Sequence, residues 1–359
     1  MAGVLLLRAL GARYRAEKCQ ITHADRRYSV AGVDAAPSLH PVAEVLRRRH
    51  AEGSRPGART DPHRVVLAVE GGGARGAVSG GMAQALDELG LVEAFDGFYG
   101  SSAGALNAVW LLSPDPMIGL STWTDETFAR AYANVRNPIR RRRPFIDVRA
   151  LIEELYETRA PLDWQAVLDH PVTLHPLATD VATGGAVDLA GLITDKRSLQ
   201  LALRATCTIP LLGGRPVALG GGHYLDAGLA ESIPFRAALA GGATHVLVLR
   251  SRRSIDADRP GALTFGITSW WLKRHGEPIR DAYRSRSDRL AAADRELDRY
   301  AGDHDCEPSV LSIRAPDSSP RVGRLESDFE AIAEGMRAGH AAAVAALTGG
   351  QLARAHAPI

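Results

Sequence analysis

Cysteine is scarce in this sequence, which has 359 residues and only Cys19, Cys207 and Cys306. An odd number of widely spaced cysteines argues against a disulfide framework and against a zinc site, and it is compatible with a reducing compartment. Long apolar runs are missing too. No stretch of about 18 apolar residues occurs, so we expect no transmembrane helix. The apolar run after Met1 is too short for a secretory signal, and no basic segment precedes it. These absences predict a cytoplasmic protein.

The sequence also lacks a strong charge of one sign. It has 43 basic and 41 acidic residues, a net charge of +2, so no global field for nucleic acid is expected. Lysine occurs only as Lys18, Lys196 and Lys273, and with so much alanine and glycine we attribute this to coding bias. The hydrophobic content of 45% is that of a globular protein with a sizeable core. The length allows one large or two ordinary domains.

Two glycine-rich turns follow strand-like segments near the start of the main domain. The apolar run at 65–70 leads into a glycine loop, Gly71 to Gly76, whose backbone N–H groups no helix or sheet would satisfy. Such amides are the raw material of an oxyanion hole. The segment 95–104 ends in Gly-x-Ser-x-Gly, which places Ser102 on a sharp turn between strand and helix. A nucleophile and an anion cradle at strand ends predict acyl-transfer chemistry.

The glycine loop also fits two nucleotide-binding patterns in part. Its Gly-x-Gly-x-x-Gly spacing matches the dinucleotide fingerprint, but the next strand ends at Ser102 without the acidic residue that would hold a ribose. A P-loop needs Gly-Lys-Ser/Thr, whereas Gly76 is followed by Ala77. Nucleotide binding is therefore disfavoured, and a glycine turn needed only for close packing stays an alternative.

Strand-like and helix-like segments alternate along the chain. Strands are expected at 64–70, 95–99, 172–179, 244–249 and 310–313, and helices at 78–89, 103–112, 121–134, 147–157, 197–206 and 325–347. This alternation predicts a mostly parallel central sheet with helices on both faces, a three-layer α/β/α fold. Ligands bind at the carboxyl ends of the strands in such sheets, where both glycine turns would lie.

The domain organisation predicted is simple. Residues 1–62 are arginine-rich, end in a linker-like segment and are interpreted as a partly ordered N-terminal extension with a helix near 42–50. Residues 63–359 form the main domain, which includes the C-terminal helices.

A serine hydroxyl needs a base, and the chain offers two kinds of candidate. None of the 12 histidines has a setting that singles it out, and His223 is interpreted as a surface turn residue. Asp226 follows a short apolar segment, and the glycines around it permit close approach to another backbone. A partly desolvated carboxylate that touches the serine can act as general base, because burial raises its pKa toward neutrality. The alternative is a turn or helix-capping aspartate.

The three motifs, in this order, resemble the patatin-like phospholipases, which are related to the catalytic domain of cytosolic phospholipase A2. The resemblance covers residues 64–250 and includes a linking stretch at 205–210. It implies a patatin-like α/β/α fold, a Ser–Asp dyad without histidine and hydrolysis of acyl lipid esters, with no metal or organic cofactor. Carried over by position, it makes Ser102 the nucleophile and Asp226 the general base. The oxyanion hole would be Gly72, Gly73 and Ala74, and the residues that support this loop would be Arg75, Gly71 and Gly76.

One position departs from the family pattern. Ala227 fills the middle of the aspartate motif, where the family usually has glycine, and alanine costs roughly 1 kcal/mol or more if the turn needs a positive φ. Two alternatives stay open: an acyltransferase or thioesterase with the same nucleophile, and a non-catalytic α/β protein that binds an anion or a nucleotide.

A lipid substrate requires contact with an interface. Trp270 and Trp271 stand beside Lys273 and Arg274, a combination that suits the headgroup region of a membrane. We therefore expect peripheral membrane contact through these residues. The alternative is that the tryptophans cover an edge of the core.

Overall fold

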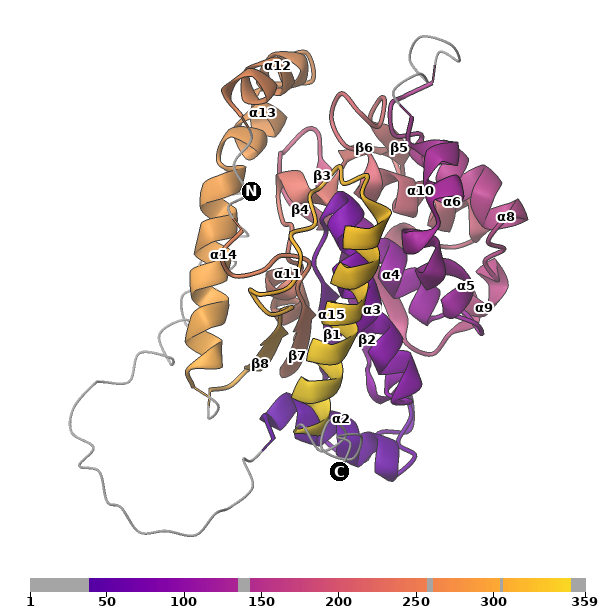
Figure 1. Ribbon diagram of the computed structural model, residues 1–359, viewed down its shortest axis with the longest axis vertical. Helices are drawn as coiled ribbons and strands as arrows, with labels where there is room; N and C mark the ends of the chain where they lie inside the picture. Colours follow the sequence, from indigo (N-terminus) through magenta and orange to yellow (C-terminus); the bar gives the residue numbers. More distant parts are fainter. Residues whose placement is uncertain (1–38, 135–142, 257–260, 304–305, 350–359) are drawn as a thin grey trace, which may run out of the picture.

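The centre of the structure is one eight-stranded sheet (Figure 1). The computed structural model describes residues 39–134, 143–256, 261–303 and 306–349. The strand order is β5-β6-β3-β2-β1-β7-β8, and β4 pairs with β3. The strands are β1 (Val65–Val69), β2 (Gly97–Ser101), β3 (Thr173–Asp180), β4 (Ala186–Asp188), β5 (Val217–Leu219), β6 (Gly222–Leu225), β7 (His245–Leu249) and β8 (Ser309–Ile313).

The pairing of the strands brings the three sequence motifs to one edge of the sheet. Strands β1, β2, β3, β7 and β8 are parallel, so their carboxyl ends lie together. The glycine loop follows β1, and Ser102 follows β2. Strand β6 runs antiparallel to β3, with Leu225 opposite Thr179, so the segment after β6 begins beside the carboxyl end of β3. Asp226 therefore reaches the same edge.

The helices are listed here in chain order. They are α2 (Pro41–Ala51), α3 (Gly76–Glu88), α4 (Ala103–Leu111), α5 (Met117–Leu120), α6 (Glu126–Tyr132), α7 (Val148–Ala150), α8 (Tyr156–Thr158), α9 (Trp164–Asp169), α10 (Lys196–Cys207), α11 (Phe235–Ala240), α12 (Ala262–Lys273), α13 (Glu277–Arg284), α14 (Arg286–Ala301) and α15 (Phe329–Thr348).

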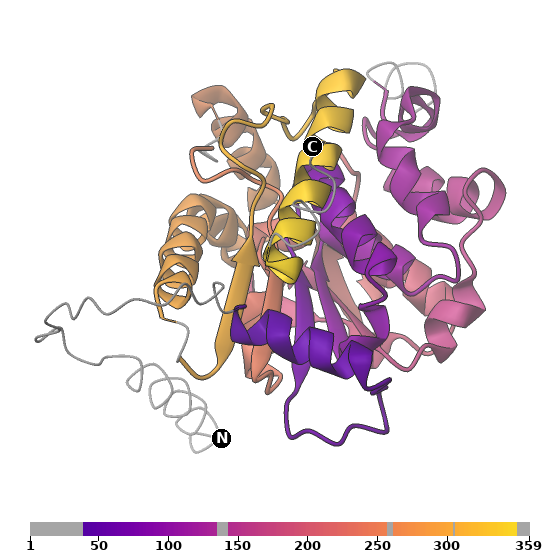
Figure 2. The ribbon, with the colours of Figure 1, turned by 60° about the horizontal axis from the view of Figure 1, so that its bottom comes forward.

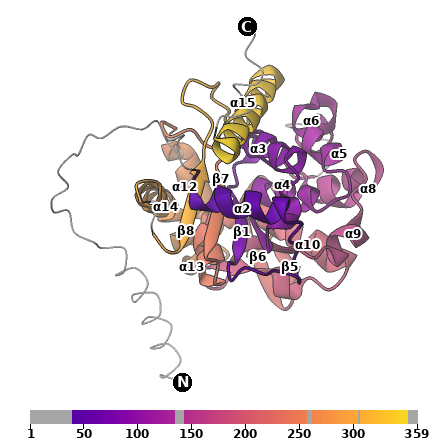
Figure 3. The same ribbon diagram turned by 90° about the horizontal axis from the view of Figure 1, so that it is seen from below.

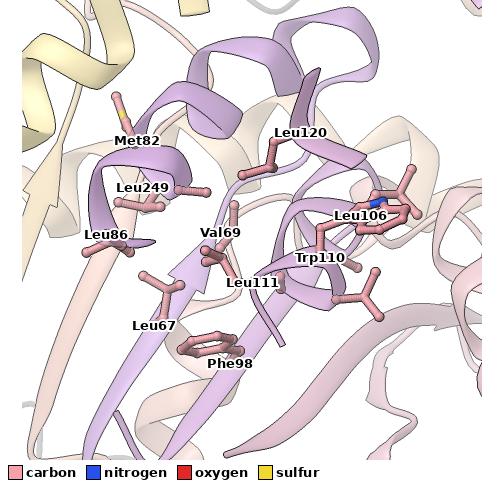
Figure 4. Packing of buried hydrophobic residues seen from close by; sticks show 14 of the residues in the cluster. Leu67, Val69, Met82, Leu86, Phe98, Leu106, Trp110, Leu111, Leu120 and Leu249 are labelled. Atoms are coloured by element: carbon pink, nitrogen blue, oxygen red, sulfur yellow. The ribbon is translucent and has the colours of Figure 1, made fainter. Parts of the chain in front are cut away.

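Alternate residues of the central strands pack into two separate layers. Leu67 and Val69 of β1 join a large apolar cluster with α3, α4 and α15, part of which Figure 4 shows. Val66 and Ala68 point the other way, toward α11 and α14. Figures 2 and 3 show α3 and α15 side by side on one face of the sheet and α14 beyond its β8 edge. The predicted three-layer α/β/α fold is confirmed, because each face of the sheet is covered by its own apolar cluster.

Several predicted elements differ in their bounds. The predicted helix at 121–134 is a 3₁₀ turn (Ser121–Thr124) followed by α6, because Asp125 is extended and its side chain caps Phe128 N. The predicted helix at 147–157 is interrupted by a π-helical segment at Leu151–Leu155. The predicted strand at 95–99 runs instead from 97 to 101. The predicted C-terminal helix begins later, at Phe329, where Asp328 supplies the N-cap.

Cys207 is free and buried, as expected for a thiol inside a globular protein.

A buried arginine ties α2 to the amino ends of the first two strands. Arg49 is fully buried, and its guanidinium donates to the carboxylates of Asp61 (2.7 Å) and Asp96 (2.9 Å) and to the carbonyls of Ala94 and His63. Figures 1 and 3 show α2 across this end of the sheet. The described part of the predicted 1–62 extension therefore packs on the core, whereas residues 1–38 lie outside the described residues.

Candidate active site

Ser102 occupies a strained turn between β2 and α4. Its φ of 52° and ψ of −126° lie in a region that L-residues rarely adopt, at a cost of about 1–3 kcal/mol. The backbone around it holds this conformation, because Ser102 N donates to Thr206 Oγ1 (2.8 Å) and Ser102 O accepts from Ala105 N (2.8 Å). The side chain thus stands directly before the N-terminus of α4, where positive dipole ends favour a developing anion.

Both glycines of the Gly-x-Ser-x-Gly motif are required by close packing. A Cβ at Gly100 would lie 2.4 Å from Ala105 Cα, and one at Gly104 would lie 2.2 Å from Val69 O. Neither backbone contact can yield without moving β1 or α4. The two glycines therefore allow the serine turn to fold against the end of the neighbouring strand.

Asp226 is fixed by contacts with three different segments. Its backbone N donates to Thr208 O (2.9 Å), its carbonyl accepts from Thr179 Oγ1 (2.9 Å), and its Oδ1 accepts from Gly228 N (2.9 Å). Its Oδ2 is buried and makes no hydrogen bond of ordinary geometry in the described part of the chain. The Ser102 side chain lies close enough to this carboxyl group to lower its pKa, and both residues line the same cavity. The structure thus brings Ser102 and Asp226 together.

The pKa of Asp226 reflects this position at the wall of a cavity. Burial raises its pKa above the ordinary aspartate value, and this is the largest effect. Hydrogen bonds from Ser102 and Gly228 N and the positive charge of Arg286 offset part of the increase. Arg286 also donates from Nε to Gly228 O (2.8 Å), so it supports the turn that carries the aspartate. Sequence reasoning missed Arg286, because it lies on α14, 60 residues further along the chain.

Ala227 causes no backbone strain. The only non-glycine residues with positive φ in the described chain are Ser102 and Leu211. Ala227 instead begins a 3₁₀ turn (Ala227–Leu229). Its methyl group packs in the apolar cluster that includes Val66 and Ala68 of β1. Alanine therefore fits where the family usually has glycine.

The glycine loop approaches the serine turn closely. A Cβ at Gly71 would lie 2.5 Å from Ser101 O and 3.0 Å from Ser102 Cβ. Gly73 has a φ of 61° and lies under the Arg324 carbonyl, which would be 2.4 Å from an added Cβ. This position needs glycine for both reasons. Gly76 ends the loop as the first residue of α3.

The backbone N–H groups of the glycine loop differ in whether they already donate a hydrogen bond within the protein. Gly71 N donates to Ser232 O (3.0 Å), and Ala74 N donates to Arg324 O (2.9 Å). Among the described residues, no hydrogen bond uses the amides of Gly72 or Gly73. Of the three predicted oxyanion donors, two are therefore available in this conformation, and the Ala74 amide is engaged.

A buried ion network anchors the start of this loop, and sequence reasoning did not find it. Glu70 lies between β1 and the loop; its Oε2 accepts from Arg250 Nε (2.9 Å) and Ser251 N (2.9 Å), and its Oε1 from Arg252 Nε (2.8 Å). Ser251 Oγ donates to Gly71 O (2.8 Å). Both arginines also contact Asp294 of α14.

The electrostatics of Glu70 follow from this network. Burial alone would raise its pKa, but the charges of Arg250, Arg252 and Arg75 outweigh burial and hold the pKa well below its usual range. Arg75 is buried, and its positive charge lowers the pKa of Glu70.

Two cavities open onto Ser102. The larger has a volume of about 580 Å³, and its walls include Ala74, Leu106, Leu151 and Ile332. The smaller has a volume of about 350 Å³ and contains Asp226 and the glycine loop. Among the described residues, no histidine lines either cavity, and His223 is exposed on β6.

The two tryptophans of α12 have different environments. Trp270 is 64% exposed, with the Arg274 guanidinium 4.8 Å from its ring centroid. Trp271 packs beside the apolar cluster of Leu225 and Tyr283 and against the His275 ring. Leu263 and Ile267 are also exposed and lie on the same side of α12 as Trp270, at helical spacing. One tryptophan thus faces outward, and the other covers an edge of the core.

No three histidine, cysteine, aspartate or glutamate side chains in the described parts of the chain are placed to hold a metal ion. No helix within the same parts combines the length and the apolar character needed to span a membrane.

The Glu70 network predicts a stability effect. Glu70→Gln should lower the free energy of unfolding by about 3–5 kcal/mol, because it leaves buried arginines without their carboxylate. The exposed Glu88, which pairs with His340 at the surface, supplies the control. Glu88→Gln should cost at most about 1 kcal/mol. Urea unfolding midpoints measure both variants, and equal midpoints for the two would contradict the role assigned to Glu70.

The chain is similar to known proteins over much of its length. Residues 67–239 match the family described as patatin-like phospholipase. The uncharacterized protein YjjU of Escherichia coli (strain K12) is 28% identical over 277 residues, which are 72% of this chain and 63% of YjjU. The chain thus matches less than two thirds of the length of that relative.

A solved structure, that of VipD from Legionella pneumophila, aligns with a TM-score of 0.39 and 12% identity over 80% of this chain and 67% of VipD. The family match spans the glycine loop, the Ser102 turn and Asp226 in the order found here. Over residues 67–239, the chain is similar to the patatin-like phospholipase family.

Proposed function

We propose that the protein is a serine lipid acyl hydrolase that cleaves carboxylic esters of phospholipids or related acyl lipids. The observation that carries this proposal is the pairing of a strained Ser102 with the Asp226 carboxyl group. A strained backbone conformation and a raised carboxylate pKa each lower the free energy of unfolding. Features of this kind are concentrated at catalytic sites.

The first half of the reaction forms an acyl-enzyme. Asp226 accepts the proton of the Ser102 hydroxyl while Oγ attacks the ester carbonyl carbon. The resulting oxyanion is stabilised by the amides of Gly72 and Gly73, and each donor of this kind is worth about 3 kcal/mol. The Ala74 N–H already donates to the Arg324 carbonyl, so it is not counted among these donors. The tetrahedral intermediate then expels the alcohol, which takes the proton from Asp226.

The second half releases the acid. Asp226 accepts a proton from a water molecule, whose oxygen attacks the acyl carbon of the Ser102 ester. The same amides stabilise the second oxyanion. Collapse of this intermediate breaks the bond to Ser102 Oγ, which recovers the proton from Asp226. The fatty acid leaves, and no metal or organic cofactor takes part in these steps.

The alternative functions differ from a hydrolase in the substrate or in the molecule that accepts the acyl group, or they involve no reaction at all. An acyltransferase would pass the acyl group from Ser102 to another alcohol, and a thioesterase would begin from a thioester. A non-catalytic protein would use the Gly72 and Gly73 amides only to bind an anion. The raised pKa of Asp226 favours catalysis, because a binding site for anions gains nothing from a nearby carboxylate.

We also propose that the protein contacts a membrane surface through α12. Trp270 presents its ring outward beside Arg274, and Lys273 lies in the last turn of the helix. These residues suit the headgroup region of a bilayer. Trp271 would support the helix from within, because it packs against the core.

The dyad predicts the effect of three substitutions. Ser102→Ala and Asp226→Asn should each lower the kcat for a p-nitrophenyl ester by about 10⁴-fold or more, because each removes a group that acts as part of one unit. His223→Ala should change it less than about twofold, since His223 is exposed on β6. Mass spectrometry after treatment with a fluorophosphonate should find the label on Ser102. An active Asp226→Asn together with an inactive His223→Ala would instead indicate a histidine base.

The raised pKa of Asp226 predicts the pH dependence. Asp226 must be ionised to accept a proton, so kcat/KM should fall as the pH decreases through its raised pKa, at a higher pH than for an ordinary aspartate. Arg286→Gln removes a positive charge that lowers this pKa, so the acid limb should move to higher pH. Arg286→Lys keeps the charge and should move it less. An acid limb that is the same in all three proteins would contradict the assignment of Asp226 as the base.

The membrane proposal predicts a binding difference. Trp270→Ala should weaken sedimentation with vesicles that contain phosphatidylglycerol by about tenfold in Kd, because it removes the exposed aromatic anchor. Ile118→Ala is the control, since Ile118 is another exposed apolar residue, on α5. A loss of binding in both variants, or in neither, would argue against α12 as the contact.

A further inference from the structure

Ser102 lies at the junction of two cavities that differ in one decisive residue. Both cavities are lined by Gly73, Ser102 and Ile209, and both border the segment that carries Arg324 and Leu325. Asp226 lines only the smaller cavity. The two sides of an ester bound at Ser102 can therefore extend into two different cavities. Only the smaller cavity contains the Asp226 carboxyl group.

The path of the proton during the reaction determines which cavity holds the alcohol and which holds the acyl chain. In a reaction of this type the base that takes the proton from the nucleophile later gives it to the leaving oxygen, so the leaving group must lie on the side of the base. We propose that the smaller cavity holds the leaving alcohol and the larger cavity holds the acyl chain. This inference rests on the proposed hydrolase function.

The lining of the larger cavity suits an acyl chain. Leu106, Leu151 and Ile332 are all buried and contribute apolar walls from α4, the π-helical segment and α15. Ala129 of α6 also lines this cavity and is half-buried. Transfer of the methylene groups of an acyl chain from water to such walls is favourable.

The smaller cavity suits an alcohol that carries an anionic group. Arg286 and Arg324 line it beside Asp226, the one acidic residue among its described walls. Both arginines place a positive charge at the wall of the cavity from which the alcohol would depart. Tyr283 and Leu212 contribute apolar surface, so the alcohol can also carry an apolar part.

Two features make the smaller cavity a formed site rather than a gap. Leu211, one of its wall residues, has a φ of 68°, a conformation that persists only when the surroundings enforce it. Thr268 of α12 is buried and forms another part of the wall, and the exposed Thr264 borders the same cavity. The helix that carries Trp270 thus also lines the alcohol cavity.

Matched substitutions test the assignment. Thr264→Trp narrows the smaller cavity, and Ala129→Trp narrows the larger one; both positions lie on helices at the cavity walls. The substrates are a 1-acylglycerol 3-phosphate, the 1-monoacylglycerol with the same acyl chain, and p-nitrophenyl esters with chains from butyryl to palmitoyl. Ratios of kcat/KM between substrates are the readout, so a general loss of activity does not mimic the result.

The expected ratios differ between the two variants. Wild-type protein should prefer the acylglycerol phosphate over the monoacylglycerol by about tenfold or more, and Arg286→Gln should remove this preference. Thr264→Trp should lower, by about tenfold, the ratio of the acylglycerol phosphate to the p-nitrophenyl ester of the same acid. Ala129→Trp should instead lower, by a similar factor, the ratio of palmitoyl to butyryl p-nitrophenyl ester.

Opposite results would overturn the assignment. If Thr264→Trp shortened the preferred acyl chain, or if Ala129→Trp changed the preference for the alcohol, the two cavities would be assigned the wrong way round. Equal rates on the phosphate and the neutral substrate in wild-type protein would refute the anionic alcohol. A wild-type protein that hydrolyses no ester would refute the proposed function itself, which is a different outcome.

Discussion

The carboxylate of Glu70 is the point on which the site depends. It sits where β1 ends and the glycine loop begins, and it is held by two arginines that follow β7. Ser251, between those arginines, holds the carbonyl of the next residue, Gly71. The loop therefore starts from a fixed position, although its glycines restrict the backbone very little by themselves. Buried ion networks of this kind are costly to break, which makes them suited to fixing a position.

Rigid supports and local strain are combined around Ser102. The serine adopts a positive φ, and Thr206, Gly100 and Gly104 create the contacts and the space that keep it there. Asp226 is held from β3, from the segment after α10 and from its own turn. The Ser102 and Asp226 side chains thus come from different parts of the chain but lie at the same edge of the sheet. Preorganisation of this kind is what electrostatic stabilisation of a transition state requires.

The sequence was informative where chemistry depends on local pattern. Close packing at the strand ends permits only glycine beside Ser102 and in the glycine loop. These glycines recur at fixed spacing, so both features can be recognised as sequence motifs. Glu70 and Arg250 are 180 residues apart, so their contact leaves no local pattern. A charged residue at the end of a buried strand was the only available signal. The engagement of the Ala74 amide by Arg324 was equally invisible, since it arises from a distant turn before α15.

The hydrogen bond from Ala74 N to Arg324 O links two parts of the molecule thermodynamically. One N–H cannot serve this carbonyl and a bound anion at the same time. An anion that used the Ala74 N–H would have to displace this carbonyl, so its binding free energy would include the cost of breaking that hydrogen bond. A substitution that altered the turn ahead of α15 would change this cost, even at a distance from Ser102.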